Sequence, residues 1–163
     1  MELRKFREIF DLYYGKVRSY AYYKTGNLEL SEDIVQDTFM KLWERREMIN
    51  EATVKPLVYT MADNSIKNYF RHQKAAYNFV MKMPFSGITE AADFQLEQEE
   101  FNQFLNRTLA EIPEKNRVVF LMNRIDKLTY AEIAACFDIS VKTVEKRMGE
   151  ALEIIRKRIR YKI

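Results

Sequence analysis

Five polar residues near the end of the chain have side chains suited to hydrogen bonding with nucleic acid. Lysine and arginine contact phosphates, hydroxyl groups help to position the backbone, and both kinds of side chain can reach base edges in the major groove. Apolar residues recur between them at three- and four-residue spacing, so the five lie at the start and on the exposed face of a predicted helix. The residues that we expect to contact DNA are Ser140, Lys142, Thr143, Lys146 and Arg147.

The segment that precedes this helix has the pattern of a helix-turn-helix. Thr129 and Glu132 have the spacing of a capping box, which predicts that a short helix begins at about Tyr130. Asp138 suits the following tight turn because Asp tolerates left-handed backbone better than most residues, and Ser140 can cap the second helix. Such a second helix would enter the major groove with its N-terminus first. The alternative is an ordinary helical hairpin with a solvated, charged face.

Composition favours an all-α protein. The chain has 163 residues, of which 47% are hydrophobic and 31% charged, so it can bury one core or two small ones. It contains only 4 Gly and 3 Pro, and its β-branched residues do not alternate with polar residues for long, so we expect helices rather than strands. The net charge of +3 is modest, but basic residues are concentrated from Lys142 onward.

Several classes of function lack the residues that they would need. The single cysteine, Cys136, excludes an intramolecular disulfide and is expected to be a small buried hydrophobe. The single histidine, His72, is not part of a catalytic signature, and no glycine-rich phosphate loop is present, so an enzyme is a poor interpretation. We expect no cofactor and no metal site. The charged N-terminus and the lack of a long apolar run predict a cytoplasmic protein without membrane insertion.

The N-terminal part of the chain has the pattern of two amphipathic helices. In the first, aromatic and aliphatic residues follow one side from Phe6 to Tyr20. Ser31 is placed to cap the second, whose apolar stripe includes Val35 and Phe39. The opposite face of the second helix is acidic and amide-rich, which by itself is most typical of a solvated surface. That face consists of Asp33, Gln36, Asp37, Met40 and Glu44.

A third helix is expected after Pro56, which suits the first turn of a helix. Aromatic rings alternate along it with cations and amides, a combination that can stack unpaired bases and hold their backbone. Tyr59 and Phe70 fit a buried core equally well. The stretch 72–92 contains Pro84, Ser86 and Gly87 and has the character of a linker, and acidic residues outnumber basic ones from about His72 to Glu100. We therefore expect two small helical domains, at 1–71 and 93–163.

Two segments together resemble one protein family. Residues 31–43, with the sequence Ser-Glu-Asp-Ile-Val-Gln-Asp-Thr-Phe-Met-Lys-Leu-Trp, and the later helix-turn-helix are similar to the sigma-70 family of bacterial RNA polymerase sigma factors. The size and the two-domain layout resemble the extracytoplasmic-function (ECF) subgroup. The resemblance implies a sigma factor that binds bacterial core RNA polymerase and promoter DNA and directs promoter-specific transcription initiation, with no enzymatic activity. It also suggests an anti-sigma factor as a further partner.

The resemblance implies a role for each candidate surface. The acidic face of the second helix would dock on the polymerase, and the helix-turn-helix would read the minus-thirty-five promoter element. The segment around the third helix would recognise and melt the minus-ten element, which requires a base to be extruded at a cost of a few kcal/mol of stacking. The residues implied for the minus-ten element are Asn50, Lys55, Asn64, Lys67, Asn68, Tyr69 and Arg71.

A free-standing helix-turn-helix transcriptional regulator is the alternative function. It would combine the same C-terminal DNA reader with an N-terminal interaction domain that binds a ligand or a second copy of the chain. Such a domain would be expected to show a ligand cavity or a self-complementary apolar seam. The sequence of the first domain instead predicts an acidic helix and a helix of aromatic and cationic residues. A pure interaction adaptor is a third interpretation.

Overall fold

Helices make up the secondary structure of the described chain. The computed structural model describes the backbone of residues 1–72 and 96–162 and the side chains of residues 1–72 and 103–160. Within those ranges it contains seven α-helices, two short 3₁₀ turns and no strand, so the all-α prediction is confirmed. The elements are α1 (Leu3–Thr25), α2 (Leu28–Glu44), η1 (Arg46–Met48), η2 (Glu51–Thr53), α3 (Val54–His72), α5 (Leu96–Glu111), α6 (Glu114–Arg124), α7 (Tyr130–Phe137) and α8 (Val141–Lys162).

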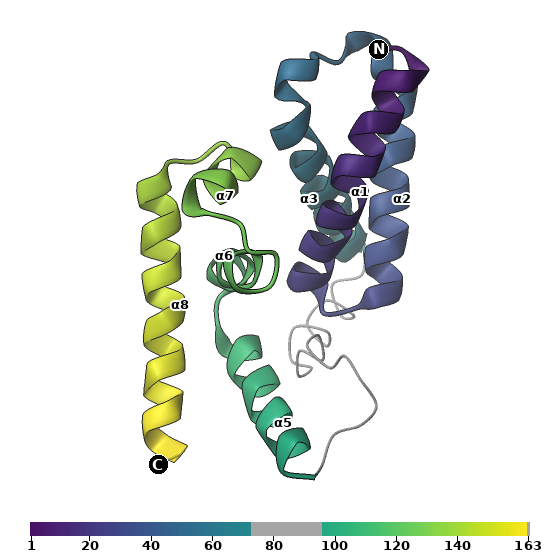
Figure 1. Cartoon of the computed structure of the whole chain (residues 1–163). Helices are drawn as coiled ribbons and strands as arrows, with labels where there is room; N and C mark the ends of the chain where they lie inside the picture. Colours follow the sequence, from purple (N-terminus) through teal and green to yellow (C-terminus); the bar gives the residue numbers. More distant parts are fainter. Residues whose placement is uncertain (73–95, 163) are drawn as a thin grey trace.

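The first three helices form one bundle (Figure 1). Aromatic rings hold α1 against α2, as where Phe10 meets Phe39 edge-on with a centroid separation of 5.1 Å. Pro56 lies in the first turn of α3, as predicted. Farther along α3, Tyr59 is 2% exposed and Phe70 is 7% exposed. These two rings therefore belong to the core, which answers the question that the sequence pattern left open.

The predicted cap of the second helix is wrong. α2 begins at Leu28, and its cap is Asn27, whose Oδ1 accepts a hydrogen bond from the Leu30 N–H at 3.0 Å. Ser31 is instead buried within the helix, where its hydroxyl donates to the carbonyl oxygen of Asn27 at 2.6 Å. Gly26 explains the early start, because its left-handed backbone (φ 64°) ends α1 and turns the chain directly into Asn27.

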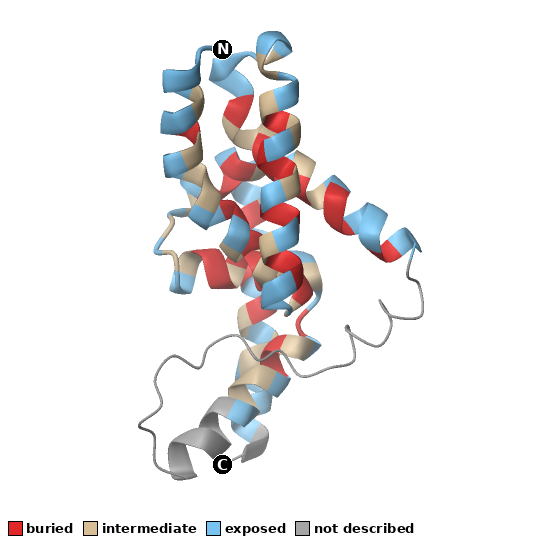
Figure 2. Cartoon of the chain, turned by 90° about the vertical axis from the view of Figure 1, so that its right-hand side faces the viewer, coloured by how far each residue is buried: buried red, intermediate tan, exposed pale blue. Residues whose placement is uncertain are grey.

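The later helices continue the core of the first three, because the buried apolar residues of both parts form one cluster. α8 packs along α5, α6 and α7, and apolar side chains from these helices are buried between them (Figure 2). Each of the largest is at most 1% exposed, so the packing leaves little freedom in how α8 sits. They include Leu109, Ile112, Leu121, Ile133 and Met148.

The two domains lie against each other. α1 and α3 of the first domain contact α6 and α7 of the second (Figure 1). The sequence predicted two domains but not this packing. The predicted linker at 72–92, apart from His72, and the predicted start of the second domain at residue 93 lie outside the described residues, so these boundaries stay a prediction. Over the described part of the chain, we find no helix with the length and apolar character needed to span a bilayer.

Candidate nucleic-acid and partner interfaces

Local hydrogen bonds build the helix-turn-helix as predicted. The Glu132 carboxylate accepts from the Thr129 N–H at 2.7 Å, and the Thr129 hydroxyl oxygen accepts from the Glu132 N–H at 3.1 Å. This complete capping box starts α7, and Asp138 follows α7 in left-handed backbone (φ 52°, ψ 48°). Ser140 then caps α8, because its Oγ accepts from the Thr143 N–H at 3.1 Å. Both predicted caps and the predicted turn are confirmed.

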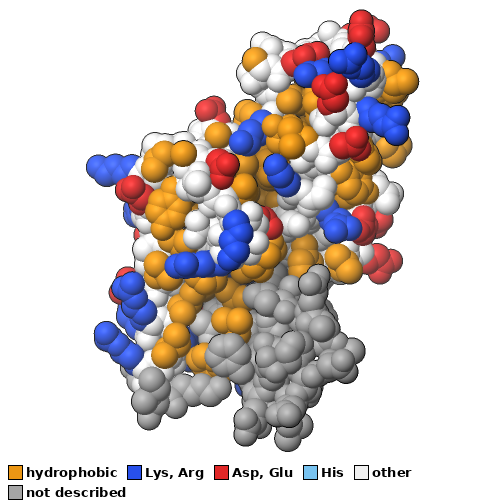
Figure 3. Space-filling model, viewed as in Figure 1, with side chains coloured by type: hydrophobic (Ala, Val, Ile, Leu, Met, Phe, Trp, Pro, Cys, Tyr) orange, Lys and Arg blue, Asp and Glu red, His pale blue; other side chains and the backbone are white. Residues whose placement is uncertain are grey.

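The outer face of α8 is basic. Lys142 and Lys146 are exposed, whereas Thr143 and Arg147 are half-buried. The Thr143 and Ser140 hydroxyl oxygens lie 2.9 Å apart, so both hydroxyls take part in the cap as well as lying near the outer face. Figure 3 shows Lys and Arg side chains along the edge of the molecule that α8 forms. The apolar side of the helix is buried in the core, which fixes the face that looks outward.

The predicted polymerase-binding face lies along α2. Its exposed members are Asp33, Gln36, Met40 and Glu44. Met40 is the apolar member of this face and is 64% exposed. The fifth member, Asp37, is half-buried, and its Oδ2 accepts from the Ser65 hydroxyl at 3.0 Å and from the Lys41 ammonium at 2.6 Å. Asp37 therefore also ties α2 to α3, a structural role that the helical pattern did not indicate.

The residues predicted for the minus-ten element lie in two places. Asn50 is exposed before α3, where its Oδ1 caps η2 by accepting from the Ala52 N–H at 3.0 Å, and Lys55 is half-buried in the first turn of α3. The others are exposed along the second half of α3. Among these, the Lys67 ammonium lies 2.6 Å from the Asp63 carboxylate. The exposed set is Asn64, Lys67, Asn68, Tyr69 and Arg71.

A cleft of about 310 Å³ lies between the two domains. Asn64 and Lys67 line it from α3, and Arg147 lines it from α8. The structure therefore brings together residues that the sequence assigned to two separate DNA-binding surfaces. Lys24 and Lys115 also line the cleft and add to its positive charge.

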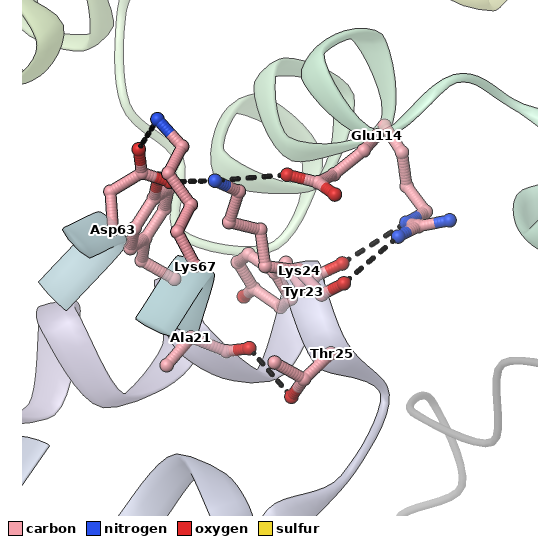
Figure 4. Close-up of polar contacts among 9 residues, drawn as sticks. Ala21, Tyr23, Lys24, Thr25, Asp63, Lys67 and Glu114 are labelled. Atoms are coloured by element: carbon pink, nitrogen blue, oxygen red, sulfur yellow. Dashed lines mark hydrogen bonds and ion pairs between the residues drawn. The ribbon is translucent and has the colours of Figure 1, made fainter. Parts of the chain in front are cut away.

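Sequence analysis missed two residues at the contact between the domains, Lys24, which lines the cleft, and Arg117. Lys24 reaches from α1 to Asp63 of α3 and to Glu114 of α6, 2.9 Å away (Figure 4). Burial lowers the pKa of the Lys24 ammonium, and the Glu114 carboxylate opposes that shift. Arg117 of α6 is 5% exposed and donates to the backbone of α1. In the sequence, Arg117 is marked only by its position directly before the apolar run 118–122. That position does not indicate which residues it contacts.

The described residues offer little for metal or thiol chemistry. Among residues 1–72 and 103–160, no three His, Cys, Asp or Glu side chains are grouped so that they could hold a metal ion. Cys136 is 2% exposed, and burial raises the pKa of its thiol. A protonated, buried thiol is a poor nucleophile, so its predicted role as a small core residue fits the structure.

Comparison with known families matches both domains. The family model for Sigma-70 region 2 matches residues 9–76, and the model for Sigma-70 region 4 matches residues 105–155. This chain belongs to the sigma-70 family. The first match spans α1 to α3, and the second spans most of the helical domain that carries the helix-turn-helix.

Relatives of this sigma factor include members of the ECF subgroup. It is 26% identical to the ferric citrate uptake sigma factor FecI of Escherichia coli (strain K12), over 91% of this chain and 87% of that protein. It is 26% identical to the ECF RNA polymerase sigma factor SigW of Bacillus subtilis (strain 168), over 95% of this chain and 89% of that protein. The predicted subgroup is confirmed.

A solved structure shares the fold. The sigma factor RpoE of Bartonella quintana, solved in complex with the anti-sigma factor NepR, matches 97% of this chain and 98% of its own, with a TM-score of 0.68 and 18% sequence identity. Together with the family matches, the comparisons establish the function. The protein is an ECF sigma factor that binds core RNA polymerase and promoter DNA and directs transcription initiation, and the free-standing regulator is not favoured. Sigma factors are regulators without an enzymatic activity.

Proposed function

We propose that three surfaces of this ECF sigma factor divide the work of promoter recognition. The acidic face of α2 binds core polymerase, the outer face of α3 with the segment before it contacts the minus-ten element, and the start of α8 reads the minus-thirty-five element. The observation that supports the division best is the capped helix-turn-helix. Its two caps and left-handed turn hold the basic start of α8 outward, as a recognition helix requires.

The polymerase-binding surface is supported by exposure and charge. Asp33, Gln36 and Glu44 leave carbonyl and carboxylate oxygens free to accept hydrogen bonds from a partner, and Met40 adds an exposed apolar side chain beside them. An exposed methionine among polar residues suits the centre of a protein interface, where polarizable side chains adapt to the surface that they meet. Asp37 contributes by holding α2 on α3, and its second carboxylate oxygen can still face the partner.

The minus-ten surface is supported by one exposed ring among cations and amides. Tyr69 is 37% exposed and stands on α3 between Asn68 and Arg71, so a base could stack on the ring while the neighbouring side chains hold its phosphates. Lys67 and Asn64 extend this surface toward the second domain. Asn50 and Lys55 lie before α3 and in its first turn, at the segment where we place the extruded base.

The minus-thirty-five surface is the first turns of α8. Lys142 and Lys146 reach solvent and can contact phosphates, and Arg147 can pair with a guanine through two parallel hydrogen bonds. Ser140 and Thr143 bring hydroxyls to the N-terminus of the helix, where the partial positive charge of the backbone favours a phosphate.

The remaining assignments follow from these partners. Because core polymerase and promoter DNA are in the bacterial cytoplasm, we place the protein there and assign it no catalytic step of its own. An anti-sigma factor that covers one or more of the three surfaces is a fitting regulator, as NepR is a partner of the structurally similar RpoE.

Run-off transcription tests the proposal. Purified bacterial core polymerase is supplied with promoter fragments from the source genome, with and without this protein. We expect transcripts that start at defined positions only when the protein is present. Sequence-specific DNA binding by the protein alone, with no effect on transcription by core polymerase, would instead support a free-standing regulator.

A further inference from the structure

The cleft between the domains carries more positive than negative charge. Its volume of about 310 Å³ is at the lower end of the range of small-molecule sites. Four of its lining side chains are cationic and one, Asp63, is acidic, and Glu114 lies beside the cleft, 2.9 Å from a lining ammonium. Four positive charges against these two carboxylates leave an excess of two. The cations are Lys24, Lys67, Lys115 and Arg147.

The two carboxylates are already engaged, so the excess charge can be located. Asp63 contacts the ammonium groups of both Lys24 and Lys67, and Glu114 contacts Lys24 (Figure 4). Among the side chains that the structure describes, Lys115 and Arg147 have no ion-pair partner. The positive charge that remains to be balanced is therefore at these two residues, which line the cleft from α6 and α8.

The ammonium groups of the cleft act on one another. The side chain of Lys24 is 10% exposed, and this burial lowers the pKa of its ammonium. The Glu114 carboxylate opposes the shift, and the positive charges of Lys67 and Lys115 add to it. Lys67 belongs to the first domain and Lys115 to the second, so cations of both domains repel Lys24. An anion bound among them would reduce this repulsion, whereas a neutral ligand would not.

An aromatic and an aliphatic side chain line the cleft beside the cations. Phe137 and Ile139 are half-buried and line it from the second domain. The Phe137 ring lies 5.4 Å from the Tyr20 ring, centroid to centroid, and the Lys24 ammonium lies 5.6 Å from the centroid of the same tyrosine. Because Phe137 and Lys24 are both neighbours of Tyr20, one small molecule can reach the apolar part and the cationic part of the cleft together.

α3 supplies hydrogen-bonding groups along the same cleft. Thr60, Asn64 and Lys67 are exposed at four- and three-residue spacing on one face of the helix, and all three line the cleft. The Asn64 amide can both donate and accept, as recognition of a base edge or a sugar hydroxyl requires. The Thr60 hydroxyl donates to the carbonyl oxygen of Pro56 at 2.9 Å, so its own oxygen is left to accept.

We propose that this cleft binds a nucleotide, with its phosphates among Lys67, Lys115 and Arg147 and its base against Phe137. Phosphates supply the negative charge that the cations require, and the base supplies a flat apolar face for the ring. Its sugar and base edges supply hydrogen-bonding partners for Asn64. The site goes beyond the proposed function, which assigns no small molecule to the cleft and gives Lys115 and Phe137 no role.

Isothermal titration calorimetry of the full chain with GDP and with ADP, in the absence of Mg²⁺, tests the site. Lys115→Ala should weaken binding about threefold, the effect of losing an exposed ion pair. Arg147→Ala should weaken it about tenfold, because a guanidinium can form two parallel hydrogen bonds with a phosphate. Lys142→Ala is the matched control, because it removes the same charge as Lys115→Ala from an exposed position of α8 that does not line the cleft. It should bind as wild type does.

Pyrophosphate distinguishes a nucleotide site from a basic patch. It carries two phosphates without a base or a sugar, so wild type should bind it about tenfold more weakly than GDP if the base stacks on Phe137. Phe137→Leu keeps an apolar side chain without a ring, and its affinity for GDP should fall toward that for pyrophosphate. Because Phe137 also packs against Tyr59, at a centroid distance of 5.6 Å, the comparison of GDP with pyrophosphate in wild type carries the test if this variant melts.

Three results would overturn the proposal. The first is the lack of binding of either nucleotide up to millimolar concentration. The second is an equal loss of affinity in Lys115→Ala and Lys142→Ala, and the third is a pyrophosphate affinity equal to that for GDP. The second and third would show a general attraction of anions to a basic protein. Because these titrations contain neither polymerase nor promoter DNA, failure of the proposed function in run-off transcription would not change their outcome.

Discussion

Arg147 belongs both to the proposed DNA-binding face of α8 and to the cleft between the domains. It lies on the basic face of α8 at the position predicted for base contact, and it is half-buried because that face borders the cleft between the domains. The sequence predicted its place on the helix because caps and spacing are local signals. It could not predict the half-burial, which depends on residues from α1 and α3 that lie far away in the chain.

The contribution of Arg147 can be measured in the assembled holoenzyme. We expect Arg147→Ala to weaken binding to the minus-thirty-five element by about 1–3 kcal/mol and to leave binding to scrambled duplexes nearly unchanged. Lys142→Ala is the comparison, because loss of a phosphate contact should weaken binding to all duplexes alike and reduce the salt dependence. Fluorescence anisotropy over a series of salt concentrations measures both. An equal loss on all sequences for Arg147→Ala would contradict its assignment to base reading.

Met40 offers a cleaner test of the polymerase surface than Asp37, whose carboxylate also bonds to Ser65. The Met40 side chain is 64% exposed, so Met40→Ala should leave the Tm unchanged while weakening core polymerase binding by at least about 1 kcal/mol. Leu12→Ala on α1 removes a comparably exposed apolar side chain, 53% exposed, and should bind polymerase as wild type does. Equal affinities for all three proteins in a polymerase titration would remove α2 from the interface.

At the scale of elements, prediction succeeded where a signal was unique and failed where two signals competed. Thr129 and Ser140 were each predicted as a helix cap and Asp138 as the turn residue, and the structure confirms all three. For the start of α2 the chain offers both Asn27 and Ser31, and the left-handed Gly26 decides in favour of Asn27. The choice depends on where the preceding helix ends, which a residue-by-residue search for caps does not consider.

Gly149 weakens the interior of α8. It is exposed, and a Cβ built there meets no atom within 4 Å, so Gly149→Ala should stabilise the protein by about 0.5–1 kcal/mol through reduced freedom of the unfolded chain. The corresponding rise in Tm is roughly 1–4 °C in thermal unfolding followed by circular dichroism. Gly26→Ala is the control of opposite sign, because the φ of 64° at that position strains any residue with a Cβ. A Tm that falls for Gly149→Ala would show that the glycine has a role in α8 beyond its flexibility.

The capping box of α7 should depend on pH. Hydrogen bonds from the backbone and hydroxyl of Thr129 lower the pKa of Glu132 below its ordinary 4.5. Because the folded pKa is the lower one, the stabilisation is present above the ordinary value and is lost as the pH falls through the folded pKa. Glu132→Gln keeps an oxygen acceptor but does not titrate. We expect wild type to exceed this variant in free energy of unfolding at about pH 7 and the difference to shrink as the pH falls below the ordinary pKa of the carboxyl. A difference that does not change with pH would exclude the carboxylate as the source.

For the whole molecule, the pattern of helices predicted two domains, and the resemblance predicted their partners, but neither predicted how the domains meet. The contacts between them join positions such as Arg117 and Tyr23, 94 residues apart in the chain. No periodicity connects such residues, and a buried arginine can be recognised only when the carbonyls that it contacts are in view. Asn64 and Lys67 of α3 and Arg147 of α8, which we assign to two DNA-binding surfaces, line one cleft in this arrangement.

Permanganate reactivity of promoter DNA tests most directly the central claim that this chain directs polymerase to a promoter and opens it there. Unpaired thymines react, and paired ones are protected. Core polymerase with this sigma factor should make thymines reactive at the minus-ten element of a promoter found by run-off transcription, and neither component should do so alone. Thymines that stay protected with both present, or that react equally with core polymerase alone, would contradict the account.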